Sequence, residues 1–149
     1  MAGETVEENN LFYTCSLIEY ISRKTKNTKK LVIEKLGKEN INKIYKLAEV
    51  YHCENIDKVS DEFIEKTNIE IGEYDIISKC KYDVPTYWDI GKVYKRLIIM
   101  VNNRETEYID TLIKVLSSWI VEKIDNYNSS MYYESPDYIY ACYKEGKVL

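Results

Sequence analysis

The scarcity of glycine and proline is the feature that most restricts what this chain can fold into. Its 149 residues contain five glycines and two prolines, whereas an all-β domain needs many turn residues. Apolar residues recur at intervals of three and four along nearly the whole chain, which is the spacing of one helix face. Together, these observations predict an all-α fold.

The apolar stripes predict one compact domain, residues 1–149, built from six or seven helices with a frayed segment at residues 1–8. The first helix should end near Lys24, and a shorter one should follow Asn55, a residue type that caps helix starts. The remaining stripes fall at residues 28–36, 41–51, 85–101, 105–126 and 136–145. The 105–126 stripe is the longest and has the widest apolar face, so we expect this helix at the centre of the core.

Several local signals mark where helices begin and end. Gly37 should stop the second helix, and Gly146 should close the last one. Ser135 followed by Pro136 is typical of an N-cap and a first helical position. Residues 67–84 show no regular stripe and are expected to form a loop, after which Pro85 suits the first turn of a new helix. Gly91, in the middle of that helix, would permit a close crossing with another helix.

The charge is unevenly spread although the net charge is only −4. Residues 23–46 hold nine Lys or Arg against two acids, and residues 54–75 hold eight acids against two lysines. The favoured interpretation is two solvated helix faces that attract each other. The alternative is a basic patch that binds an acidic partner, and the acidic global balance argues against nucleic acid as that partner.

The cysteines and the apolar runs indicate a protein of the reducing cytoplasm. Cys15, Cys53, Cys80 and Cys142 include no C-x-x-C pair, so neither a zinc site nor a disulfide framework is expected. Cys15 and Cys142 fall among apolar helical positions, where a free thiol packs as a small hydrophobe. Tyrosine aside, the longest apolar run is Leu97–Val101 with five residues, far below the roughly 18–20 that cross a membrane.

No motif for a familiar chemistry is found in the sequence. Nucleotide binding needs a glycine-rich loop, and the chain contains neither G-x-G-x-x-G nor G-K-[ST]. We expect no cofactor and no metal. His52 is the only histidine and lies beside Cys53, but neighbouring helical residues point about 100° apart, a poor arrangement for a nucleophile and its base. We interpret His52 as a capping residue that can titrate.

The strongest bias is an excess of tyrosine, with fifteen Tyr against two Phe. Tyrosine has an apolar body and a polar tip, and with tryptophan it is enriched at binding hot spots. Trp88, Tyr132 and Tyr133 are therefore the candidate partner-binding residues. The alternative is that all three pack in the core with their polar tips hydrogen-bonded.

These features favour a non-enzymatic protein-interaction module over an enzyme. Its partner would be another protein or a second copy of the same chain. One alternative is an enzyme or small-ligand-binding protein of unfamiliar type, with a pocket built from tyrosines, His52 and carboxylates. A weaker alternative is nucleic-acid binding through residues 23–46.

Three stretches resemble a family of small uncharacterised proteins from Gram-positive gut bacteria. They are LIEYI at 17–21 with KTKN at 24–27, VPTYWDIGKVY at 84–94, and MYY at 131–133 with SPDY at 135–138. The genes of that family lie near genes for other small uncharacterised proteins, some of which resemble ADP-ribosyltransferase toxins. The resemblance implies a role as an antitoxin, immunity factor or toxin accessory, and it supplies no catalytic residue.

Overall fold

The chain is all-helical in a computed structural model that describes residues 5–104 and 106–149. In these residues there are eight α-helices and one 3₁₀ helix and no strand, so the all-α prediction is confirmed and the expected count of six or seven is corrected. The elements are α1 (Val6–Thr25), α2 (Lys29–Lys46), α3 (Ala48–Tyr51), α4 (Ile56–Thr67), α5 (Tyr87–Asn102), α6 (Tyr108–Leu116), α7 (Ile120–Ile124), η1 (Met131–Tyr133) and α8 (Pro136–Glu145).

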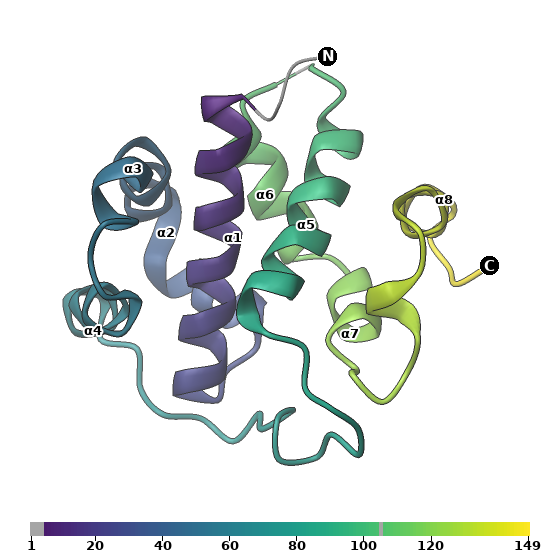
Figure 1. The fold of residues 1–149 in the computed structure, drawn as a ribbon, viewed down its shortest axis with the longest axis horizontal. Helices are drawn as coiled ribbons and strands as arrows, with labels where there is room; N and C mark the ends of the chain where they lie inside the picture. The colour runs from purple at the N-terminus through teal and green to yellow at the C-terminus, as the bar shows by residue number, and fades with distance from the viewer. Residues whose placement is uncertain (1–4, 105) are drawn as a thin grey trace.

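Helix α1 is the axis of the molecule. Helices α2, α3 and α4 lie on one side of it and α5 on the other, with α7 and α8 beyond α5 (Figure 1). A capping box holds its first turn, because Thr5 accepts from the Glu8 amide while the Glu8 carboxylate accepts from the Thr5 amide. Of the segment expected to fray, residues 1–4 lie outside the described residues and residues 6–8 are helical.

The strongest capping signals in the sequence are confirmed. Asn55 caps α4, Ser135 caps α8 with Pro136 at its start, and Gly146 ends α8 in the left-handed conformation. Gly37 has φ 72° and ψ 161°, so it breaks the helical path within α2 as expected. The start of α5 differs, because Thr86, which forms a capping box with Asp89, begins the helix and leaves Pro85 outside it.

The prediction of one long central helix over 105–126 is wrong. Glu105 lies outside the described residues, and the rest of that stripe is two short helices, α6 and α7, separated at residues 117–119. At the break Ser117 has φ −100° and ψ 3°, and the Ser118 hydroxyl donates to the Val115 carbonyl at 2.6 Å. Serine hydroxyls compete in this way for backbone groups that would continue a helix. The central position belongs to α1.

Residues 68–86 form the expected loop, which passes beneath the ends of α1 and α5 (Figure 1). Its backbone is tied to the turn between α1 and α2, where Gly72 N–H donates to the Thr25 carbonyl at 2.7 Å. Tyr74 N–H donates to the Lys26 carbonyl at 2.9 Å. The loop therefore covers one end of the helical core.

The buried apolar side chains form one continuous cluster that every α-helix contributes to. Cys15 and Cys142 lie inside it, as their helical positions predicted, and all four cysteines are free thiols. Within the described residues, no helix is long and apolar enough to cross a membrane.

Gly91 permits the close helix crossing that the sequence predicted. A β-carbon added there would lie 2.9 Å from Ser16 Cα on α1, so only glycine lets α5 approach this closely. We expect Gly91→Ala to lower the free energy of unfolding by about 1–3 kcal/mol through overpacking, measured by urea denaturation. Ser16→Gly should rescue part of this loss in the double variant, whereas strictly additive effects would contradict a direct contact.

Candidate functional site

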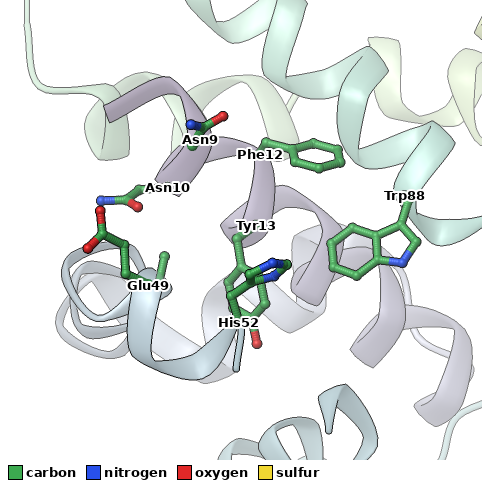
Figure 2. Close-up of a pocket in the computed structure, with 8 residues that line it drawn as sticks. Asn9, Asn10, Phe12, Tyr13, Glu49, His52 and Trp88 are labelled. Carbon is green, nitrogen blue, oxygen red and sulfur yellow. The ribbon is translucent and has the colours of Figure 1, made fainter. Parts of the chain in front are cut away.

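A groove lined by aromatic side chains lies between α1, α3 and α5, with a volume of about 340 Å³. We call it the aromatic groove. Phe12 and Trp88 lie on one side of it and Asn10 and Glu49 on the other, with Tyr13 and His52 between them (Figure 2). Its complete lining is Asn9, Asn10, Phe12, Tyr13, Ala48, Glu49, His52 and Trp88.

Local sequence signals position each wall of the aromatic groove. The capping box of Thr86 and Asp89 fixes the start of α5 and so places Trp88 in its first turn. Leu47 has φ −105° and ψ 17°, which separates α3 from α2. Ala48 is small and buried, so α3 can pack against its neighbours. His52 lies at the C-terminal end of α3, as its C-cap residue.

The rings of the aromatic groove contact one another. Phe12 and Trp88 have centroids 5.5 Å apart, and Tyr13 and Trp88 have centroids 6.3 Å apart. His52 meets the Tyr13 ring edge-to-face at 6.2 Å. Such tilted and edge-to-face pairs are the favoured geometries of aromatic rings. The rings therefore form a continuous apolar surface, and the polar side chains Asn9, Asn10 and Glu49 stand beside it.

The groups of the aromatic groove are not arranged as a nucleophile and a base. Burial, and then the negative charge of Glu54, raise the pKa of Tyr13, so its phenol stays protonated at neutral pH. The Cys53 thiol donates to the Glu49 carbonyl at 3.5 Å rather than to its neighbour His52, whose side chain is exposed. Among the described residues, no three His, Cys, Asp or Glu side chains gather as a metal site requires.

Tyr132 and Tyr133 do not line the aromatic groove. They line a separate groove of about 260 Å³, which we call the tyrosine groove, together with Val93, Arg96, Leu97, Glu134, Pro136 and Ile139. Tyr133 is 68% exposed, and its ring packs edge-to-face on Tyr132 at 5.0 Å. Trp88 and Val93 are five residues apart on α5, which corresponds to about 140° around a helix. The structure therefore brings Trp88 together with His52 and not with the two tyrosines.

The basic segment is largely paired with acids. Within residues 5–104 and 106–149, five of its nine cations form ion pairs: Arg23 with Glu19, Lys24 with Asp57 and Asp61, Lys26 with Asp75, Lys29 with Glu19 and Asp125, and Lys38 with Asp110. Lys24 and Lys26 bind three carboxylates of the acidic segment. This pairing favours the interpretation that the basic segment 23–46 and the acidic segment 54–75 attract each other over the interpretation that the basic segment is a patch for an acidic partner.

A buried ion cluster, which could not be foreseen from the sequence, joins α1, α2 and the end of α7. Glu19, Lys29 and Asp125 are fully buried, and the Lys29 ammonium contacts both carboxylates, with Asp125 at 2.7 Å. Arg23 reaches Glu19 at 2.7 Å. Two phenols complete the cluster: Tyr127 donates to Glu19 at 2.6 Å, and Tyr94 donates to Asp125 at 2.8 Å.

The two carboxyl groups of the buried ion cluster differ in their pKa values. Burial acts to raise the pKa of both, but the charges of Lys29 and Arg23 and a hydrogen bond from Tyr127 lower the pKa of Glu19 overall. Asp125 shares Lys29 with Glu19, so burial and the Glu19 charge leave its pKa raised to about 6. The one signal in the sequence was Glu19 itself, which lies on the same helix face as Leu11 and Cys15.

With this geometry in place, comparison with known proteins adds nothing further, because no family model, no curated protein and no solved structure matches the chain. The family resemblance therefore stays a prediction.

We expect Lys29→Met to lower the free energy of unfolding by about 3–5 kcal/mol, because two buried carboxylates would lose their shared cation. Lys24→Met is a matched control, since Lys24 also binds two carboxylates but at the surface, and it should have a much smaller effect. Denaturant unfolding measures both. If Lys29→Met does not fold, adding Glu19→Gln and Asp125→Asn should restore folding. An equal decrease in the free energy of unfolding for Lys29→Met and Lys24→Met would contradict the prediction, because burial would then add nothing to the pairing of Lys29.

The raised pKa of Asp125 predicts a specific pH dependence. An unfolded Asp has a pKa near 3.9, so the folded state takes up this proton first as the pH falls. The contribution of Asp125 to stability is therefore complete below about pH 4 and is lost as the pH rises through about 6. The stability of wild type relative to Asp125→Asn should fall over this window in urea unfolding. Asp57 should behave in the opposite way, because hydrogen bonds from Lys24 and Tyr20 lower its pKa in the folded state. The stability of wild type relative to Asp57→Asn should therefore fall as the pH is lowered through the pKa of Asp57.

Proposed function

We propose that this protein is a non-enzymatic interaction module that binds a segment of a partner protein in the aromatic groove. The observation that carries the proposal is the convergence of four aromatic side chains, Phe12, Tyr13, His52 and Trp88, from three separate segments of the chain. Binding hot spots are rich in Trp and Tyr and lie in an apolar centre with a polar rim. The aromatic groove has this composition, with two asparagines and Glu49 beside its rings.

Two exposed apolar side chains lie in the short helix α3 and directly before it. Val50 is 60% exposed and Leu47 is 40% exposed, and both are close in sequence to the groove residues Ala48 and Glu49. Burial of exposed apolar area is the main driving force of protein association. A partner segment that covers α3 together with the groove would remove these side chains from water.

The same groove also suits the second candidate function, binding of a small ligand. Its volume of about 340 Å³ lies within the roughly 300–1,000 Å³ of typical small-molecule sites. An enzyme would need in addition a group that attacks or transfers a proton, and in this groove His52 and Glu49 are the side chains that could serve. The partner-protein proposal is preferred because the exposed apolar side chains of Leu47 and Val50 are not part of the groove lining, and a small ligand in the groove would leave them uncovered.

On the resemblance to the family from Gram-positive gut bacteria, we propose that the partner is a toxin and that this protein is its antitoxin, immunity factor or accessory. On the same basis we propose a bacterial cytoplasmic setting. The four free thiols suit such a reducing compartment.

The test is to isolate the stoichiometric partner of the tagged protein from its host and to measure its affinity for purified variants by calorimetry. Trp88→Ala should weaken binding about 30-fold or more, the usual effect of losing a hot-spot tryptophan. Trp119→Ala, the same change at the other tryptophan, is the control and should leave binding unchanged, with circular dichroism confirming the fold of both variants.

Other outcomes assign the surface differently. Weakened binding only in Tyr132→Ala and Tyr133→Ala would place the partner in the tyrosine groove and overturn the proposal. A dimer that dissociates on Trp88→Ala, seen by light scattering, would make the partner a second copy of the chain. A small molecule retained by the purified protein and lost in Trp88→Ala, seen by native mass spectrometry, would establish the second candidate.

A further inference from the structure

A second groove, of about 340 Å³, lies between α8, the C-terminal half of α5 and the turn from α6 to α7. We call it the lysine groove. Its aromatic walls are Trp119 from the turn and Tyr140 and Tyr143 from α8, all of them half-buried. Lys114 and Lys144 also line it, one from α6 and one from α8. It shares no residue with the aromatic groove.

The charge of the lysine groove has a single sign. Lys114 and Lys144 are exposed, and none of the described residues that line the groove is acidic. Burial raises the pKa of Tyr143, so its phenol stays protonated at neutral pH and adds no negative charge to the groove. In the aromatic groove, by contrast, the charge of Glu54 adds to burial in raising the pKa of Tyr13. The two grooves therefore present different electrostatic surroundings on one chain.

The positive charge is held beside the rings. The Lys144 ammonium lies 5.4 Å from the centre of the Tyr140 ring, a cation–π contact. The aliphatic stem of a lysine can cover apolar surface while its ammonium stays in water. Ring surfaces and ammonium groups are thus close enough for one small molecule to contact both kinds of group.

We propose that the lysine groove binds a planar anion, an aromatic ring that carries a phosphate or a carboxylate. The ring would stack on the side chains of Trp119, Tyr140 and Tyr143, as nucleobases do on aromatic residues. The anionic group would be held by Lys114 and Lys144, which act as point charges with freely turning donors. This site is independent of the proposed partner-binding function.

Each tryptophan can report on its own groove, because Trp88 and Trp119 are the only two in the chain. Trp88→Phe leaves Trp119 as the single tryptophan, and its emission, excited at the long-wavelength edge where tyrosine does not absorb, reports on the lysine groove. Titration of this variant with adenosine monophosphate should change its fluorescence with saturation. Adenosine, which has the ring without the charge, and inorganic phosphate, which has the charge without the ring, should both bind at least about tenfold more weakly.

Charge-removing variants test the assigned side chains. Lys114→Gln with Lys144→Gln, in the Trp88→Phe background, should weaken nucleotide binding about tenfold or more, and added salt should weaken binding to the unaltered groove. Lys58→Gln, at an exposed lysine of α4, is the control and should leave binding unchanged. An aromatic carboxylate such as 4-hydroxyphenylacetate distinguishes the two sources of the anion, since tighter binding than the nucleotide would assign the site to aromatic acids.

The proposal is overturned if neither the nucleotide nor the carboxylate gives a saturating change. It is also overturned if binding persists unchanged in the double lysine variant, or if the response comes from Trp88 in a Trp119→Phe protein. Loss of partner binding in Trp88→Ala, with nucleotide binding retained there, would show that the two sites act separately.

Discussion

The pairing of Lys29 with two fully buried carboxylates is the interaction on which the arrangement of the helices depends. A charge removed from water is tolerated only when opposite charges and hydrogen bonds replace the water. Glu19 and Lys29 belong to α1 and α2, and Asp125 follows α7. Tyr94 of α5 and Tyr127 supply the remaining hydrogen bonds. If one of these segments moved away, a charge or a phenol would be left buried and unpaired, so the cluster specifies the packing of α1 with α2, α5 and the end of α7.

The packing around α1 also builds the aromatic groove. Gly91 lets α5 approach Ser16 on α1, and Trp88, one turn earlier on α5, reaches the rings of Phe12 and Tyr13. The buried ion cluster and the aromatic groove thus share helix α1. Glu19 belongs to the second half of α1, and the groove residues Phe12 and Tyr13 belong to its first half. A variant that loosens the cluster would disturb the groove indirectly, which is why the functional variants are best chosen outside the cluster.

The parts of the structure that could be predicted from the sequence are those determined locally. Asn55, Ser135 and Gly146 cap helices because each needs only its own backbone and the next few residues. The prediction of one helix over 105–126 was wrong because the apolar periodicity continues through Ser117 and Ser118, whereas the helix ends there and the Ser118 hydroxyl bonds to the backbone. The buried ion cluster could not be foreseen because its partners are remote: Lys29 and Asp125 are 96 residues apart, and Glu19 and Tyr127 are 108. For the same reason the sequence could nominate Trp88 and His52 separately but could not show that they share a groove.

The excess of tyrosine over phenylalanine follows from these contacts. Among the residues that the structure describes, the hydroxyl donates to a carboxylate at three positions: Tyr20 to Asp57, Tyr94 to Asp125 and Tyr127 to Glu19. Phenylalanine would fill the same space at Tyr94 and Tyr127 but would leave a buried carboxylate short of a donor, at a cost of about 1–3 kcal/mol. Others, among them Tyr132, Tyr133 and Tyr143, line grooves at the surface, where an apolar ring with a polar tip suits a wall that is partly open to water. The same residue type thus serves the core and the surface for one physical reason, and composition alone could not separate the two uses.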